Sequence, residues 1–420
     1  MSNIESGIDQ GSIDPWFALS KYKNYKFDSM NALQNSYDYI IVGAGLGGVS
    51  AAARLAENEP QAKIILVDAQ SIGASRSGHN AGFISQSLLA GQIARLCEYY
   101  PDNQYVISNI NRQAIAKIEK IKAQYSLDFD WRHDGSYRTV YGRNNSPALK
   151  ELVSLYSKIG ISVEKLDEEQ LFDRLGTQFY KEGIFLPDTI LDNPSEVIRG
   201  LATALPDNVS VFENVKVTAI HSGSHPGVQL DHYLTVNAKK IILAMNPAEN
   251  QEAGYKNAHK AAIYSLSALT RPLKDSEFAH YKNLKPWGVC ASSPDGAAVR
   301  LTHNRRIYIK TDIGPTSSTF DQSQLDKSGQ QLRRAFVKRF PDLEGVNFEY
   351  HCCRLISFPE TDFPILGEVA RNVYAVTSPE CAGAGVEFMF GHFAADLAAC
   401  RHYSALDGIC SKYQQCFLPP

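Results

Sequence analysis

The sequence of 420 residues lacks the features that mark membrane-spanning, secreted or nucleic-acid-binding proteins. No uncharged apolar run reaches the roughly 18–20 residues needed to cross a bilayer. The N-terminus, MSNIESGIDQGSIDPWF, has neither the basic start nor the apolar stretch of a secretory signal. With 42 basic and 45 acidic residues the formal net charge is -3, so bulk charge gives no attraction for nucleic acid or an anionic membrane. We therefore expect a cytoplasmic protein with no integral membrane segment and no nucleic-acid partner.

Metal-ligand and disulfide patterns are also missing. The eight cysteines form no C-x-x-C pair, and neither they nor the eleven histidines have the spacing of zinc ligands. We expect reduced thiols and no metal site. The composition, 44% hydrophobic and 21% charged, is that of an ordinary globular protein. At roughly 150 residues per domain, the length predicts two or three domains.

A compact β–turn–α–β pattern stands near the start of the chain. Tyr37–Val42 is a short apolar run typical of a buried parallel strand, and Gly43–Gly48 (GAGLGG) follows at once. Val49–Ala56 predicts a helix of small residues, and Lys63–Asp68 predicts a second buried strand. A G-x-G-x-x-G run between a strand and a helix, with an acid at the end of the next strand, is typical of a dinucleotide-binding unit.

Each part of this pattern has a physical task. Gly43 permits the tight turn, Gly45 lets the backbone approach a pyrophosphate, and Gly48 lets helix and strand pack closely. The free N–H groups at the start of the helix attract phosphates, while Asp68 accepts hydrogen bonds from a ribose. The cofactor-binding residues predicted here are Gly43, Gly45, Leu46, Gly47, Gly48, Asp68 and Ala69. The alternative is a glycine-rich turn in an unrelated α/β protein.

The rest of the chain favours FAD over NAD. NAD-dependent dehydrogenases usually continue with regular βα units after the second strand, whereas residues 71–92 here form a long loop rich in glycine and serine. No second fingerprint appears near the middle of the chain, where a pyridine-nucleotide disulfide reductase has one. We expect FAD to be the sole dinucleotide.

Six further segments give the chain a family resemblance. They are Ser77–Gly82 (SGHNAG), Asp192–Pro194 (DNP), Ala244–Asn246 (AMN), Leu269–Leu273 (LTRPL), Asp362–Gly367 (DFPILG) and Val373–Gly385 (VYAVTSPECAGAG). In this order they resemble the FAD-dependent D-amino-acid oxidase/glycine oxidase superfamily, and more narrowly its gamma-glutamylputrescine oxidoreductase-like branch. Two departures stand out: Cys352-Cys353-Arg354 replaces the W-x-G of that branch, and Ser378 replaces a glycine.

The resemblance implies an α/β fold, with a Rossmann-like FAD-binding domain of the glutathione-reductase type and a substrate domain built on a large mixed β-sheet. The expected division is an N-terminal arm at 1–35, an FAD-binding domain at 36–96, 190–258 and 352–420, and a substrate domain at 97–189 and 259–351. Three local patterns add detail. Phe129–Tyr141 and Tyr233–Ala244 are expected to be hairpins, and Val209–Ile220 a strand.

The resemblance also implies further cofactor contacts. Ser77, His79, Asn80, Ala81 and Gly82 would lie beside the flavin, with Val217 on the adenine side. Gly383, Gly385 and Val386 would lie at the isoalloxazine, where the N–H groups of a helix start stabilise the reduced ring. An ordinary strand–helix turn is the alternative for this last segment.

His79 raises the question of a covalent flavin. Dimethylglycine and sarcosine dehydrogenases carry an H-x-A-G segment whose histidine is bonded to FAD, and His79–Gly82 has that pattern. The alternative is a polar residue that touches the cofactor without a bond. Cys353 is a rival tether, because monomeric sarcosine oxidase attaches its flavin to a cysteine close to this point.

Lys310 and Arg354 are the candidate catalytic residues. Lys310 lies near the lysine that activates oxygen in monomeric sarcosine oxidase, and a buried cation there would stabilise developing superoxide. Arg354 lies near the arginine that binds the substrate carboxylate in glycine and D-amino-acid oxidases. The alternatives are a solvated lysine at a strand end and a structural ion pair.

These features predict an FAD-dependent oxidoreductase that oxidises the C–N bond of a small amine or amino acid. Hydride would pass to flavin N5, and the resulting imine would hydrolyse. Electrons would then pass to oxygen, or, as an alternative, to a quinone or carrier. A non-catalytic flavin-binding subunit is the alternative from another class. The oligomeric state stays open.

Overall fold

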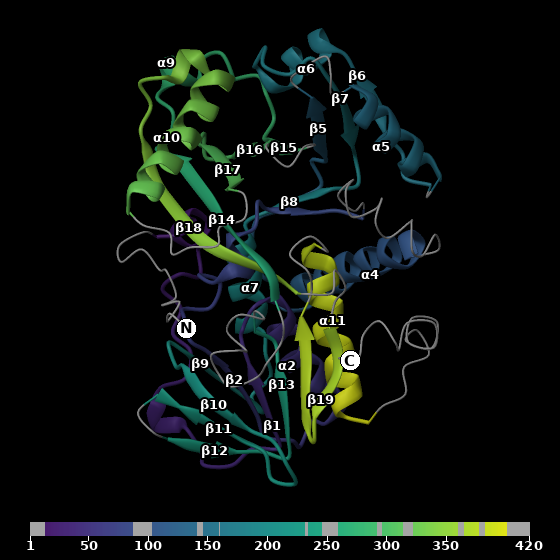
Figure 1. The fold of residues 1–420 in the computed structure, drawn as a ribbon, viewed down its shortest axis with the longest axis vertical. Helices are drawn as coiled ribbons and strands as arrows, with labels where there is room; N and C mark the ends of the chain where they lie inside the picture. The colour runs from purple at the N-terminus through teal and green to yellow at the C-terminus, as the bar shows by residue number, and fades with distance from the viewer. Residues whose placement is uncertain are drawn as a thin grey trace.

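The computed structural model describes residues 13–86, 103–140, 146–158, 160–231, 234–245, 259–291, 296–313, 322–359, 365–377 and 383–400. In this part of the chain, a six-stranded sheet and an eight-stranded sheet occupy opposite ends of the molecule (Figure 1). A small sheet of β3 (Phe83–Ile84), β8 (Ile190–Asp192) and β4 (Trp131–Arg132) belongs to neither of them. The expected α/β fold with large mixed sheets is confirmed. None of the described helices combines the length and the apolarity needed to cross a membrane.

The six-stranded sheet contains the predicted β–turn–α–β unit. Its order is β19 (Ile365–Ala370), β20 (Val373–Thr377), β13 (Lys240–Leu243), β1 (Tyr39–Val42), β2 (Ile64–Asp68) and β9 (Val209–Glu213). All neighbours run parallel except β19, which is antiparallel to β20. β1 and β2 are buried along their whole length, as expected for parallel strands covered on both faces.

The two faces of this sheet are covered differently. Helices α2 (Leu46–Asn58) and α11 (Ala384–Ala398) pack on one face, where they meet Ile41 and Leu66. The antiparallel sheet of β10 (Val217–His221), β11 (Gly227–Leu230) and β12 (Thr235–Asn237) covers the other. α4 (Asn103–Gln124) lies against α11 (Figure 1).

One face of the eight-stranded sheet is apolar, whereas the other carries polar side chains and a smaller apolar cluster. Its order is β18 (Phe348–Pro359), β14 (His259–Thr270), β17 (Ile307–Ile313), β16 (Ala297–Leu301), β15 (Trp287–Ala291), β5 (Ser136–Val140), β7 (Glu182–Leu186) and β6 (Glu164–Leu166). Only β15 and β5 run parallel. Because side chains alternate along a strand, Leu266 and Ile309 join the cluster under α10 (Gln322–Arg339), whereas Ser267 and Lys310 point to the opposite face.

Two expected hairpins are wrong. β4 pairs with β8, and β5 pairs with β7 and β15, so the segment around Gly135 bends between two sheets. Gly135 does adopt a turn conformation, with φ +72°. β12 and β13 also belong to different sheets, and the expected strand Val209–Ile220 breaks into β9 and β10 at Asn214, where φ is +61°. The turn expected at Gly135 does form, but packing against strands that are distant in the sequence decides which strands pair.

The remaining helical elements include α1 (Pro15–Leu19), α5 (Ser146–Lys158), α6 (Glu168–Leu175), α7 (Pro194–Thr203), α9 (Asp275–Phe278) and the 3-10 turns Met30–Ala32, η2 (Arg76–His79) and Pro341–Leu343. The N-terminal segment from residue 13 is tied to α7. Buried Arg199 donates to the carbonyls of Tyr22 and Tyr25 and pairs with Glu213. The expected boundaries of the N-terminal arm, the FAD-binding domain and the substrate domain stay a prediction.

The family-like segment Asp192–Pro194 forms a strand-to-helix step, and it buries a carboxyl group. β8 ends at Asp192, Asn193 caps α7, and Pro194 is its first residue. The Asp192 side chain is buried, and its Oδ1 atom has no hydrogen-bond partner among the described residues. Burial raises the pKa of Asp192 to about 7, although the nearby charge of Arg300 opposes the shift.

Gly48 should tolerate no side chain. A Cβ at Gly48 would overlap the carbonyl oxygen of Gly43, so Gly48→Ala should lower the free energy of unfolding by about 2 kcal/mol or more. Gly329 lies in α10, has nothing within 4 Å of the position that a Cβ would take, and serves as the control. Gly329→Ala should raise stability by about 0.5–1 kcal/mol. Urea unfolding of both variants tests this; equal effects would contradict it.

Asp192→Asn should change how stability depends on pH. In the folded chain the carboxyl group keeps its proton up to about pH 7, whereas in the unfolded chain it ionises near its ordinary pKa of 3.8. Folding therefore loses stability as pH rises from about 4 to 7. The variant should gain about 2–4 kcal/mol relative to the parent between pH 4 and pH 8. Exposed Asp128 provides the control, since Asp128→Asn should show no such gain.

Candidate active site

The predicted glycine turn and the acid of β2 are held together. Gly43 has φ +99°, and its N–H donates to the carbonyl of Val67 at 2.8 Å. The Ala44 N–H donates to Asp68 Oδ2 at 2.7 Å, and the Gln70 N–H donates to Oδ1 at 2.8 Å. The sequence predicts that this carboxylate also accepts from a ribose hydroxyl. Ala69, next in the chain, is exposed.

The start of α2 has the form of an anion site. Gly45 is the N-cap residue and supplies no side-chain hydrogen bond, so the first N–H groups of the helix lack that partner. A Cβ at Gly45 would lie only 2.5 Å from the hydroxyl of Ser77, so glycine is required for the close approach. Gly45 and Ser77 thus meet at the start of the helix, where the sequence predicts that N–H groups bind phosphates, whereas Ser77 was expected beside the flavin.

Sequence reasoning missed Glu387, which reaches the same point from α11. Its Oε1 atom lies 2.5 Å from Ser77 Oγ and accepts the Gly47 N–H at 3.4 Å. The available signal was an acid in the first turn of the C-terminal helix, directly after Val386.

Lys310 and Arg354 lie on the face of the eight-stranded sheet opposite α10, and they reach the loop before β3. Lys310 Nζ donates to the carbonyl of His79 at 3.1 Å, and Arg354 Nη2 donates to the carbonyl of Ala74 at 3.1 Å. The Nε and Nη1 atoms of Arg354 are buried and have no partner among the described residues. The structure therefore brings both predicted catalytic residues to the predicted flavin loop.

The same loop is fixed by aromatic and cationic side chains. Trp16 Nε1 donates to the carbonyl of Asn80 at 3.0 Å, and the Trp16 ring lies 4.5 Å from that of Tyr308. Arg300 is buried and donates to the carbonyl of Gly82 at 2.9 Å. Ala81 packs against the cluster that contains Trp16. The segment around Asn80 is therefore rigidly seated on the sheet.

His79 is buried, with each of its ring nitrogens beside an oxygen of the chain. It is 1% exposed, its Nδ1 atom lies 2.6 Å from Asp14 Oδ2, and its Nε2 atom lies 3.3 Å from the carbonyl of Ser265. Burial lowers the pKa of His79, although Asp14 acts in the opposite direction. Asp14 also caps α1 by accepting the Trp16 N–H. Sequence reasoning missed Asp14, although an Asp before Pro15 is a typical helix start.

Cys352 and Cys353 point to opposite faces, as strand alternation requires. Cys353 lies in the apolar cluster under α10, away from the flavin loop, so the rival tether proposed from the sequence is wrong. Cys352 lies with Asp14 and His79, all three buried and with ligand atoms within 4.8 Å of one another. Two ligand atoms bound to the same zinc ion would lie roughly 3.3 Å from each other, which is farther apart than the closest atoms of His79 and Asp14. The 2.6 Å contact between His79 and Asp14 instead identifies a hydrogen-bonded pair.

The start of α11 is also closely packed. Gly383 is its N-cap, with φ +88°. A Cβ at Gly385 would overlap Asn111 of α4, whose Oδ1 atom is buried without a partner in the described ranges. Val386 is 1% exposed. Val217 lies two residues after Val215, whose N–H donates to the carbonyl of Asp68 at 2.8 Å, and its side chain packs with Val67 on the other face of the sheet. Its expected place on the adenine side stays a prediction. Residues 246, 362–364 and 378–382 lie outside the described residues.

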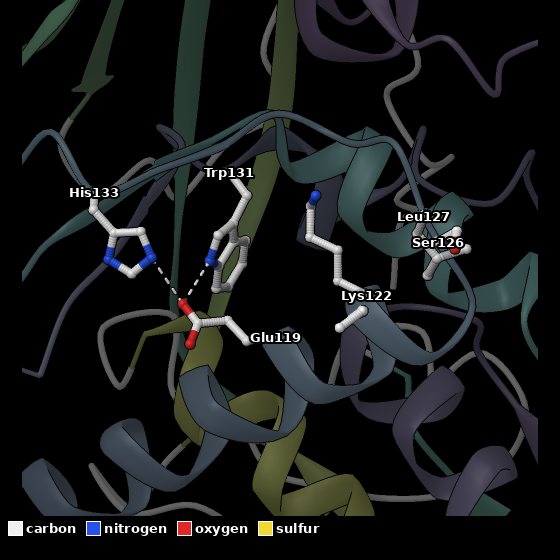
Figure 2. A pocket seen from close by; sticks show the side chains of 7 residues that line it. Glu119, Lys122, Ser126, Leu127, Trp131 and His133 are labelled. Atoms are coloured by element: carbon white, nitrogen blue, oxygen red, sulfur yellow. Dashed lines mark hydrogen bonds and ion pairs between the residues drawn. The ribbon is translucent and has the colours of Figure 1, made fainter.

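A cavity of about 550 Å³ lies apart from this site, between α4 and β4 (Figure 2). Glu119 accepts hydrogen bonds there from Trp131 Nε1 at 3.0 Å and pairs with His133 Nε2 at 2.9 Å. The His133 side chain is 67% exposed, so the hollow is open to solvent. None of the residues predicted to bind the cofactor lines it.

Comparison with known proteins agrees with this geometry. Residues 38–399 match the DAO family model, described as FAD dependent oxidoreductase. No curated protein matches the chain.

Solved structures share the fold at low identity. Glycine oxidase from Geobacillus kaustophilus is 16% identical, with a TM-score of 0.70 over 88% of this chain and 96% of that one. L-proline dehydrogenase from P. horikoshii is 15% identical, with a TM-score of 0.66 over 92% and 100%. L-alpha-glycerophosphate oxidase from Mycoplasma pneumoniae, solved with FAD bound, is 15% identical, with a TM-score of 0.67 over 87% and 95%. The chain belongs to the DAO family of FAD-dependent oxidoreductases.

Proposed function

We propose that this chain binds FAD and oxidises the C–N bond of a small amino acid or amine. The observation that carries the proposal is Arg354, which offers two buried guanidinium nitrogens with no partner among the described residues, beside the loop predicted to hold the flavin. Buried donors without acceptors are costly, so a site of this kind favours a ligand that supplies them. A carboxylate fits, because a guanidinium holds it through two parallel hydrogen bonds.

The residues present fit FAD. The turn from Gly43 to Gly48 and the start of α2 would hold the diphosphate with Ser77, and Asp68 would hold the ribose. The bound flavin supplies the hydride acceptor, at N5. The protein excludes water from the contact between the loop and the sheet, where His79 and Arg300 are buried.

Arg354 favours an amino acid over a simple amine. Glycine oxidase and L-proline dehydrogenase, which share this fold, are named for amino acids. The glycerophosphate oxidase has the same fold and a different substrate, so the fold alone leaves the substrate open. The narrower resemblance to the gamma-glutamylputrescine oxidoreductase-like branch, read from the sequence motifs, is consistent with a substrate that carries both an amine and a carboxylate.

Lys310 supports an oxidase rather than a dehydrogenase. Its ammonium group is held by the carbonyl of His79, next to the loop that would line the flavin. A fixed cation in a water-poor site stabilises negative charge that develops on oxygen. We propose oxygen as the acceptor, and peroxide released during aerobic turnover would separate it from a quinone or carrier.

The contacts of His79 favour a non-covalent flavin. Both of its ring nitrogens already face acceptors of the chain, Asp14 and the Ser265 carbonyl. A bond to the flavin would require one of these contacts to be given up. We therefore propose that His79 positions the loop, and that FAD is held by non-covalent contacts alone.

One experiment tests both the reaction and the role of Arg354. The protein is mixed under anaerobic conditions with amino acids and, as matched partners, with the amines that they give on decarboxylation. At least one amino acid should bleach the flavin band near ~450 nm, a general property of reduced flavin. Arg354→Met should weaken binding of that amino acid by about 10- to 100-fold, with little effect on the paired amine. If bound flavin is bleached by no member of the panel, the catalytic proposal fails, and a non-catalytic subunit takes its place.

Acid precipitation tests how FAD is attached. The pellet should be colourless and the flavin should remain in the supernatant, because no covalent bond is expected. His79→Asn should still copurify with FAD if its role is to position the loop. A yellow pellet from the parent, lost in the variant, would contradict the proposal and establish His79 as the tether.

A further inference from the structure

Asn111 places an amide oxygen without a partner at the start of α11. This residue lies in α4 and is 2% exposed, and its Oδ1 atom has no hydrogen-bond partner among the described residues. A Cβ built on Gly385 would lie 2.4 Å from this oxygen, so the amide faces the backbone of the first turn of α11. Its neighbours Ile110 and Ala114 are buried in the apolar cluster that α4 shares with α11.

An unpaired amide oxygen is costly at such a contact between helices. Burial removes the hydrogen bonds that the oxygen would make to water, and no group of the described chain replaces them. Alanine at position 111 would continue α4 without this penalty, since it has the higher helix propensity and no polar atom. The position of Asn111 therefore favours a ligand that supplies the missing donor.

The first turn of α11 offers donors beside this acceptor. Gly383 is the N-cap residue and makes no side-chain hydrogen bond, and the first N–H groups of a helix have no partner within it. The next residue, Ala384, packs against the cluster of Ile84 and Ile115. Ile84 belongs to β3, which follows the loop predicted to hold the flavin. This end of α11 thus adjoins the predicted flavin site.

We infer that the amide oxygen of Asn111 accepts a hydrogen bond from the N3–H group of the flavin. This inference rests on the proposed function. The pyrimidine edge of the isoalloxazine carries an N–H group between two carbonyl groups, so it needs an acceptor flanked by donors. Asn111 supplies the acceptor, and the start of α11 supplies donors next to it. A carboxylate or a phosphate carries acceptors alone and would leave the amide oxygen without a donor.

One substitution and one altered cofactor test the inference. In 3-methyl-FAD a methyl group replaces the N3 hydrogen. The parent protein should bind 3-methyl-FAD about tenfold or more weakly than FAD, because the hydrogen bond is lost. Asn111→Ala should bind FAD about tenfold more weakly than the parent does, and should bind the two cofactors about equally, because neither then meets an acceptor at N3. Calorimetry after removal of the bound FAD gives the dissociation constants.

Asn208 provides a matched control. Its Nδ2 atom donates to the carbonyl of Ala62 at 3.0 Å. It directly precedes β9 and so lies at the amino end of the parallel strands, whereas the glycine turn follows the carboxyl end of β1. Asn208→Ala should leave the affinities for FAD and for 3-methyl-FAD unchanged.

The stability of the protein without cofactor separates a ligand contact from a structural role of Asn111. Asn111→Ala should unfold at the same urea concentration as the parent or at a higher one, since the oxygen that it removes has no partner in the described chain. A lower midpoint together with an unchanged affinity for FAD would make Asn111 a structural residue and would overturn the inference.

The remaining outcomes also decide between the two proposals. A parent that binds FAD and 3-methyl-FAD equally overturns the inference, and so does an Asn111→Ala protein that favours FAD as strongly as the parent does. If Asn111→Ala does not fold, Asn111→Leu also lacks the amide and has the same expected affinities. A parent that binds neither cofactor overturns the proposed function itself, and the inference with it.

Discussion

The seating of one loop, from Gly73 to Gly82, between two sheets is the constraint on which the candidate site depends. On one side Ser77 meets the glycine turn of the six-stranded sheet, and on the other the loop carbonyls accept from Lys310 and Arg300 of the eight-stranded sheet. A cofactor that lies along this loop would touch both sheets. The geometry explains how residues more than 200 positions apart in the chain can serve one reaction.

The geometry of the glycine turn and of Asp68 could be predicted from the sequence because its signals are local. The turn from Gly43 to Gly48 and Asp68 lie within one β–α–β unit, and each has a task that few other residue types perform. The step at Asn193 and Pro194 was predictable for the same reason, since capping chemistry acts between near neighbours.

The contacts of His79 and Glu387 could not be predicted, because the residues that make them are far apart in the sequence. The pairing of His79 with Asp14 and the approach of Glu387 to Gly47 become visible only when the chain has folded. The hairpin expected around Gly135 failed for a related reason. A turn residue fixes the local backbone, whereas strand pairing is decided by packing against distant strands.

The seating of Trp16 has a consequence for biosynthesis. Its ring lies against Tyr308, and Asp14 beside it holds His79, so the first described turn of the chain completes a site whose last strand, β18, is made more than 300 residues later. A ribosome that adds residues in order releases this early segment long before its partner strands exist. The N-terminal turn can reach its final partners only after most of the chain has been made, so this site is completed late in synthesis.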